Sequence, residues 1–188
     1  SRHNLGTLRL SAGDLDGAIE AFHAVVDLRP DMAAARVDLG RALGAAGHLD
    51  EAIRTLQYAT TLDDSLGAAR YTLGVAYRHK GLTAEAAEQL SLAVALGPSQ
   101  VASHIALGQA HRDAGNLDAA IAALRQATGA APRSHQAHHE LGLAQAEAGD
   151  YLAAVAAFRA ALAINPSLSA SVNGLRVAEA RLARETGP

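Results

Sequence analysis

Apolar residues recur every three or four positions along this chain, and that spacing places their side chains on one face of an α-helix. In residues 33–46 one such face carries Leu39, Leu43 and Ala46. A second stripe follows at Ala52, Ile53, Leu56 and Ala59. Gly47 lies between the two stripes, and glycine tolerates the left-handed conformation in which helices end. The pattern therefore predicts two short helices joined by a turn at Gly47.

The same pair of helices is predicted five times, with a period of 34 residues. The Leu-Gly pair of the first helix recurs at Leu5-Gly6, Leu39-Gly40, Leu73-Gly74, Leu107-Gly108 and Leu141-Gly142. The turn glycine recurs at Gly13, Gly47, Gly81, Gly115 and Gly149. The second helix carries an alanine followed four residues later by a large apolar residue, at Ala18 and Phe22, Ala52 and Leu56, Ala86 and Leu90, Ala120 and Leu124, Ala154 and Phe158. Four copies close on proline and the second on an acid, at Pro30, Asp64, Pro98, Pro132 and Pro166. A fixed period in this range predicts a solenoid of stacked units.

The glycine inside each first helix predicts close helix packing. Gly40 costs about 1 kcal/mol relative to alanine in a helix interior. Its recurrence indicates that the missing side chain lets the second helix approach. Carboxylates and a hydroxyl near the starts of the second helices are expected to cap them and to oppose the helix dipole, at Asp16, Asp50, Thr83 and Asp118. The expected caps of the first helices are Asp31, Ser65, Ser99 and Ser167.

Together these positions resemble the tetratricopeptide repeat family over residues 1 to about 168. The resemblance implies an all-α protein, a right-handed superhelical solenoid of five antiparallel helix-turn-helix units. The family's aromatic residue three positions before the leucine is replaced by Arg2, Arg36, Arg70, His104 and His138. Its tyrosine three positions after the glycine survives only as Tyr77. We therefore expect a thinner core, completed by alanine, by arginine stems and by the packing histidines.

The period divides the chain into five repeats and one further helix. The predicted repeats are residues 1–32 (truncated at its start), 33–66, 67–100, 101–134 and 135–168, followed by a C-terminal capping helix and tail at 169–188. Leu175, Ala178 and Leu182 form the apolar stripe of that last helix, and its other face is polar, as a terminal unit requires.

The first repeat has no comparable cap. We interpret the chain as an excised or processed piece, because it lacks an initiator methionine and begins inside a repeat. The edge of the first repeat is expected either to continue into missing sequence or to pack against another copy. A monomer at high concentration in sedimentation would contradict the second option.

Composition narrows the possible functions. The net charge of -3 argues against general attraction to nucleic acid or membrane surfaces. With no cysteine, the chain has no disulfide, thiolate nucleophile or cysteine-type zinc site. It has no signal peptide and no apolar run long enough to span a bilayer, so we expect a cytoplasmic protein without membrane insertion.

No catalytic motif accompanies the repeats, so we predict neither an enzyme nor a cofactor. His135, His138 and His139 have helical spacing, and His135 and His139 could share a face and bind a transition metal. His138 occupies a packing position, and two surface histidines make a weak site, so no metal site is predicted.

In the resembled family, the first-helix face opposite the Leu-Gly pair lines a concave groove that commonly receives extended peptides or helices. Carried over to this chain, the groove would comprise His3, Asn4, Thr7, Leu10, Ser11, Val37, Asp38, Arg41, Ala45, Tyr71, Thr72, Val75, Arg78, His79, Ile105, Ala106, Gln109, Arg112, Asp113, His139, Glu140, Leu143 and Glu147. Among these, the predicted partner-binding residues are Asn4, Asp38, Arg41, Tyr71, Arg78, His79, Gln109, Arg112 and His139.

The groove residues favour an unspecialised peptide site. A Lys/Asn/Arg clamp for chaperone C-termini is absent, since His3 and Thr7 stand where lysine and asparagine are expected. An asparagine ladder is absent too, because only Asn4 fits it. The cluster of Arg41, Arg78 and Arg112 suits carboxylates, which suggests an acidic peptide across repeats two to four. The alternative is that these arginines pair with Asp38, Asp113 or other acids on a solvated face.

Three functions follow. The first is an interaction scaffold or adaptor that binds a peptide or protein segment in its groove. The second is a substrate-recruiting arm of a larger transferase-type enzyme, since such repeats occur fused to transferases. The third is self-assembly by end-to-end stacking through the first repeat. The fold alone does not choose among them.

Overall fold

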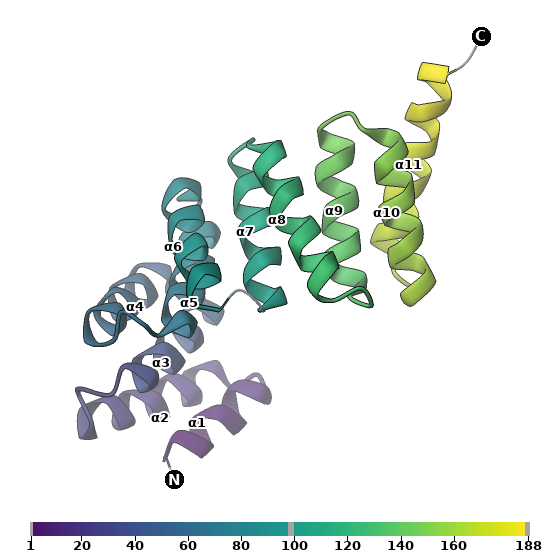
Figure 1. The fold of residues 1–188 in the computed structure, drawn as a ribbon. Coiled ribbons are helices and arrows are strands. Elements are labelled where there is room, and N and C mark those ends of the chain that lie inside the picture. Colours follow the sequence, from purple (N-terminus) through teal and green to yellow (C-terminus); the bar gives the residue numbers. More distant parts are fainter. Residues whose placement is uncertain (1, 98–99, 187–188) are drawn as a thin grey trace. The chain divides into compact units, whose positions relative to one another are not determined.

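The structure is a computed structural model, and it describes residues 2–97 and 100–186. This part of the chain is all-helical, with eleven helices and no strand (Figure 1). The helices are α1 (Arg2–Ser11), α2 (Leu15–Leu28), α3 (Ala33–Ala45), α4 (Leu49–Leu62), α5 (Gly67–His79), α6 (Thr83–Leu96), α7 (Val101–Asp113), α8 (Leu117–Ala130), α9 (His135–Glu147), α10 (Tyr151–Ile164) and α11 (Ser169–Thr186). The predicted five pairs of helices and the additional C-terminal helix are therefore confirmed. None of the described helices is long and apolar enough to cross a membrane.

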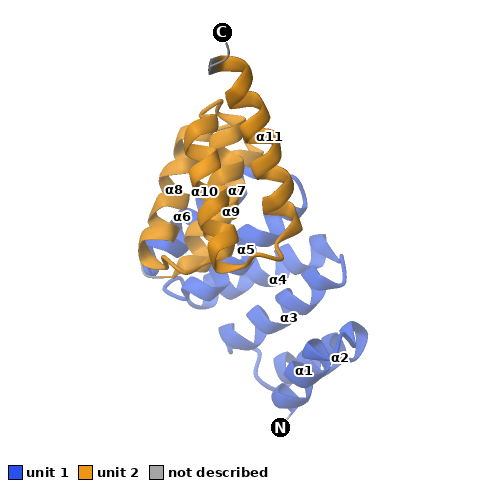
Figure 2. Cartoon of the chain, turned by 90° about the vertical axis from the view of Figure 1, so that its right-hand side faces the viewer, with its two compact units in different colours: residues 1–98 blue, residues 99–188 orange. Residues whose placement is uncertain are grey.

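The chain forms two compact units, residues 1–98 and 99–188 (Figure 2). Unit 1 contains α1 to α6, and unit 2 contains α7 to α11. Within each unit, every helix packs against the next, and each first helix also contacts the first helix of the following repeat. Figure 1 shows this stacking most clearly for α7 to α11, which lie side by side.

The turns within the pairs form as predicted, because glycine lies at the required position of each. Gly47 has φ +84°, and the glycines of the other four turns also have positive φ. In this conformation a residue with a Cβ is disfavoured, so the turn glycine sets where the first helix ends.

The predicted helix caps are mostly wrong. Side-chain caps come from Asp14, Ser134 and Asp150. The predicted Asp16, Asp50, Thr83 and Asp118 lie inside the first turn, where the three carboxylates oppose the helix dipole without capping.

Asp31 and Ser65 lie one residue too early to cap their helices. The cap positions of α3 and α5 are held by Met32 and Leu66, which pack against the core of unit 1. The packing of Met32 and Leu66 against the core therefore determines where α3 and α5 begin. Ser65 and Ser167 instead donate to the side chains of Asp63 and Asn165. The predicted cap Ser99 and the closing Pro98 lie outside the described residues.

The recurring glycines of the first helices bring the two helices of each repeat together. A Cβ on Gly40 would lie 2.5 Å from Cγ of Leu56, a fully buried residue of α4. The same approach recurs between Gly6 and Phe22, Gly74 and Leu90, Gly108 and Leu124, Gly142 and Phe158. The packing role predicted for these glycines is confirmed.

Polar side chains lie where the resembled family has aromatic residues. Arg36 is half-buried, donates from Nη2 to the carbonyl of Pro30 at 2.7 Å and lies 4.5 Å from the ring centre of Tyr58. His104 is buried as predicted, whereas His138 is only half-buried and has its Nε2 3.0 Å from the carbonyl of Pro132.

Candidate functional site

The predicted binding residues lie on the first helices of both units. We call the exposed sides of α1, α3 and α5 the first-helix face of unit 1, and those of α7, α9 and α11 the first-helix face of unit 2. Unit 1 carries the predicted Asn4, Asp38, Arg41, Tyr71, Arg78 and His79. Unit 2 carries Gln109, Arg112 and His139. The predicted arginine cluster is therefore divided, with Arg41 and Arg78 in unit 1 and Arg112 in unit 2.

Part of the surface predicted to receive a partner is buried. Four residues expected to be exposed in the groove are buried, namely Val37, Ile105, Ala106 and Glu140. Val37 belongs to the core of unit 1, and Ile105 packs with Ala127 and Ala137 in unit 2. The residues that cover Ile105 and Glu140 include Ala137 and Arg112 of a neighbouring repeat, which the pattern of a single helix does not reveal.

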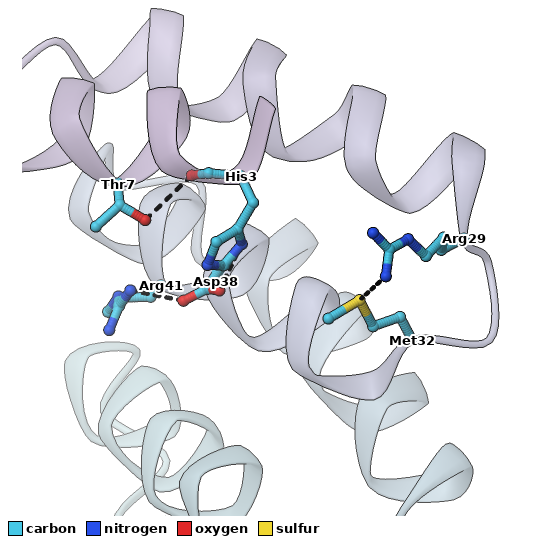
Figure 3. Close-up of polar contacts among 6 residues, drawn as sticks. All are labelled: His3, Thr7, Arg29, Met32, Asp38 and Arg41. Carbon is cyan, nitrogen blue, oxygen red and sulfur yellow. Dashed lines mark hydrogen bonds and ion pairs between the residues drawn. The ribbon is translucent and has the colours of Figure 1, made fainter. Parts of the chain in front are cut away.

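Asp38 links α1 to α3 in unit 1. Its Oδ1 accepts a hydrogen bond from Nη2 of Arg41 at 2.6 Å, and its Oδ2 lies 3.4 Å from Nδ1 of His3. Figure 3 shows His3 and Arg41 both directed at this carboxylate. The side chain of Asp38 is 17 % exposed and that of Arg41 53 % exposed. The pairing of Arg41 with Asp38 is the one that the alternative interpretation named.

A pocket of about 210 Å³ opens between α3 and α5. Its walls are mainly small or apolar, formed by Gly40, Gly44, Ala45, Thr72, Val75 and Ala76, with Arg41 and His79 completing it. Sequence reasoning listed Arg41 and His79 as site residues but missed Gly44. Gly44 could have been noticed because it is a glycine within a helix that does not recur in the other repeats. The residues at the same position of those repeats are Leu10, Arg78, Arg112 and Ala146.

Two leucine side chains of α1 are exposed. Leu5 is 43 % and Leu8 66 % exposed, whereas Leu39, the counterpart of Leu5 in the second repeat, is 2 % exposed. His3, Asn4, Thr7, Leu8 and Ser11 line a shallow hollow on α1. The position that is core in the second repeat is thus solvent-exposed here.

A buried polar network joins α7 to α9 in unit 2. Glu140 accepts from Nη1 of Arg112 at 2.6 Å and from Nε2 of Gln109 at 2.6 Å. Nε of Arg112 lies 3.5 Å from a carboxylate oxygen of Glu147. The Arg112 side chain is only 17 % exposed, and its charge is paired with two carboxylates of the protein. Arg112 therefore links two first helices, and removal of its partner would leave a buried charge unpaired.

His139 lies at a second pocket, of about 350 Å³, between α9 and α11. Its Nδ1 is 2.8 Å from Oγ of Ser171, and its ring centre is 5.8 Å from that of Phe158. The remaining pocket walls are mostly apolar. The pair of His135 and His139 lacks further ligands, since no group of three or more His, Asp or Glu side chains within residues 2–97 and 100–186 could hold a metal ion.

We expect acid to destabilise unit 2 through His111 and His139. Burial lowers the pKa of both, and for His139 the nearby Glu140 opposes this effect. The unfolded chain keeps a histidine pKa of about 6.5. As pH falls below about 6.5, these histidines bind protons in the unfolded state more readily than in the folded state. Their contribution to the free energy of unfolding is therefore fully present above pH ~6.5 and is lost as pH falls through the lower folded-state pKa values. The urea midpoint should fall between about pH 7.5 and 5.5.

The matched variants for this pH effect are His139→Gln and His111→Gln, compared with His48→Gln in unit 1. The pH dependence of the urea midpoint should flatten in the first two variants, because each removes one titrating group. An unchanged pH dependence in both would show that these histidines do not couple protonation to folding.

Comparison with known proteins identifies the repeat. Two family models described as tetratricopeptide repeat match the chain, one over residues 37–101 and 105–169 and the other over residues 9–64. A solved structure of MamA is 28% identical, with 88% of this chain and 96% of that chain covered and a TM-score of 0.76. No curated protein matches the chain significantly.

Two further solved structures resemble the chain in fold. One is YrrB, at 20% identity and a TM-score of 0.75, covering 93% of this chain and 90% of that chain. The other is from the APC/C hetero-tetramer Cut9-Hcn1, at 22% identity and a TM-score of 0.83, covering 94% of this chain and 35% of that chain. The first of the two family models alone matches more than half of the chain. The chain therefore belongs to the tetratricopeptide repeat family.

Proposed function

We propose that this protein is an interaction scaffold that binds an extended segment of a partner protein on the first-helix face of unit 1. The observation that carries the proposal is the pocket between α3 and α5, which opens on that face. Membership of the tetratricopeptide repeat family supports a protein partner. YrrB, which shares the fold, is described as having an unusual peptide-binding site, and Cut9 is in complex with Hcn1.

The pocket suits a side chain of the bound segment. Its volume of about 210 Å³ is below the range of about 300–1,000 Å³ typical of small-molecule sites. Its small wall residues leave space next to the helix backbone of α3, and Val75 supplies an apolar wall from α5. Burial of one apolar side chain there contributes about 1.5–3 kcal/mol to binding.

Gly44→Leu should weaken this binding without unfolding the protein. A Cβ at Gly44 meets no atom within 4 Å, so leucine would extend into the pocket and occupy it. The affinity for a partner peptide should fall about 10- to 100-fold, because the anchoring side chain is excluded. Stability should stay level or rise, since leucine favours the helix over glycine by about 0.5–1 kcal/mol.

The matched control is Gly129→Leu, at another helix glycine whose Cβ would also meet nothing within 4 Å, but in α8 of unit 2. Peptides selected from a random phage-displayed library on the unmodified chain would be synthesised and titrated against all three proteins. Peptides that bind Gly44→Leu as tightly as the unmodified chain would overturn the proposal.

The other sequence-based alternatives stay predictions. A recruiting arm of a larger enzyme would use the same face and would respond to Gly44→Leu in the same way. Self-association through the first repeat is favoured by one observation, the exposure of Leu5 and Leu8 on α1. It concerns a different surface, so Gly44→Leu should leave it unchanged.

A further inference from the structure

We propose that the outer stripe of α6 binds an amphipathic helix of a partner protein, with apolar residues at one end of that helix and lysine or arginine at the other. The outer stripe is the face of α6 opposite its buried residues, and it comprises Glu85, Glu88, Leu92 and Leu96. It belongs to a second helix of unit 1, and none of its residues lines the pocket between α3 and α5. The inference is therefore independent of the proposed function.

The two leucines of the outer stripe are not required by the repeat fold. Leu92 is 40 % exposed and Leu96 45 % exposed. The same two positions of α8 hold Gln126 and Ala130, and α8 forms a helix of the same length. Large apolar side chains are therefore unnecessary for packing at these positions. In α6 they leave two neighbouring apolar side chains available to a partner.

Stacking of repeats does not cover the outer stripe. The residues of α4 that correspond to the two leucines are Tyr58 and Leu62, and both are exposed. They stay exposed although a further repeat, formed by α5 and α6, follows α4 within unit 1. A partner can therefore reach this position of a second helix while the repeats are stacked.

The carboxylates of the outer stripe determine the charge of the partner. Glu85 and Glu88 are exposed, and neither forms an ion pair within residues 2–97 and 100–186. α6 contains no basic residue, and Arg70 of α5 donates to a neutral glutamine of α6 at 2.9 Å. The charge of Lys80, which precedes α6, is paired with Asp50. Two unpaired carboxylates next to two leucines favour a basic partner and disfavour an acidic one.

Helix geometry determines the order of residues in the partner. The outer stripe runs from two carboxylates to two leucines over about 16 Å, because each residue of a helix adds 1.5 Å. An antiparallel partner helix would carry two apolar residues four positions apart, followed by basic residues one and two turns later. A helix satisfies its own backbone hydrogen bonds. An extended segment would instead direct backbone N–H and C=O groups at leucine side chains, which cannot bond them.

Selection of helical peptides tests this class of partner. A phage-displayed library on a single-helix scaffold, randomised along one face, would be selected on the unmodified chain and counter-selected on Leu92→Ser with Leu96→Ser. The surviving sequences should combine apolar residues four positions apart with a positive net charge. Neutral or acidic survivors would overturn the proposal, and so would the absence of survivors.

The carboxylates are tested by titrating the selected peptides, with a fluorophore, against Glu85→Gln with Glu88→Gln. This variant keeps both leucines and should bind about five- to tenfold more weakly at low salt. The loss should shrink near 1 M salt, where charges are screened within about 3 Å. The control is Asp118→Asn, which removes an exposed carboxylate of α8 and should change nothing. Equal affinities of the unmodified chain and the glutamine variant at low salt would overturn the proposal.

The leucines are tested by the same titration. Leu92→Ser with Leu96→Ser should weaken binding about tenfold or more and keep its salt dependence. The matched control is Leu152→Ser, at an exposed leucine of α10 in unit 2, which should bind as the unmodified chain does. Gly44→Leu should also leave these peptides unaffected, so failure of this inference would not contradict the proposed function. Equal weakening by Leu152→Ser would overturn the assignment to α6.

Discussion

Phe158→Ala is expected to destabilise unit 2 by about 3–5 kcal/mol, a large part of the 5–15 kcal/mol typical of a folded domain. Phe158 is fully buried on α10. Its ring packs directly against the backbone of two glycines, Gly142 of α9 and Gly174 of α11. A Cβ on Gly142 would lie 2.8 Å from the ring, and a Cβ on Gly174 would lie 2.6 Å from it. The ring therefore joins α10 to both α9 and α11. Its removal leaves a cavity at the centre of three helices.

The effect of Phe158→Ala should include loosening of α11. Hydrogen exchange measured along the chain should show faster exchange in α11 than in α7, since α11 packs on the rest of unit 2 largely through α10. Phe22→Ala is the matched control in unit 1, where the ring packs against the single first-helix glycine Gly6. Unchanged exchange in α11 after Phe158→Ala would contradict the role of this ring as the anchor of the last helix.

Whatever recurs with the period of the repeat could be predicted from the sequence. The turn at Gly47 and the contact of Gly40 with Leu56 follow from residue types that appear in all five copies. Each depends on contacts within one repeat, and five copies of the same pattern make such contacts unambiguous. The number and order of the helices follow for the same reason.

What differs between repeats could not be predicted from the period. Met32 and Leu66 hold the cap positions because of the core that they contact, although neither side chain can cap. Glu140 looked exposed by its helix position and is buried against Arg112 and Gln109 of the preceding first helix. Such contacts depend on which residues of neighbouring repeats face each other, and one copy of the pattern does not contain that information.

The candidate site belongs to this second group. The family resemblance named Arg41 and His79 among the predicted partner-binding residues, and both line the pocket between α3 and α5. The pocket itself depends on Gly44, whose counterparts in other repeats are larger. A comparison of repeats that seeks only shared residues discards this position. The candidate site of this repeat protein is therefore found at a residue that breaks the period.

Alanine at Gly40 and alanine at Gly44 are expected to change the stability of unit 1 in opposite directions, although the two glycines lie one turn apart in α3. Each substitution removes the helix cost of glycine, about 1 kcal/mol. At Gly44 the new methyl group meets open space, so Gly44→Ala should raise the free energy of unfolding by about that amount.

At Gly40 the methyl group would lie 2.5 Å from Cγ of Leu56, which is fully buried. Relief of that overlap requires α3 and α4 to move apart or Leu56 to leave its rotamer, and such overpacking typically costs about 1–3 kcal/mol or more. The urea midpoint should therefore fall for Gly40→Ala and rise for Gly44→Ala. Leu56→Ala removes the side chain that the new methyl group overlaps. It should therefore lower the free energy of unfolding much less in the Gly40→Ala background than in the unmodified chain. Equal costs in both backgrounds would contradict the packing role of this glycine.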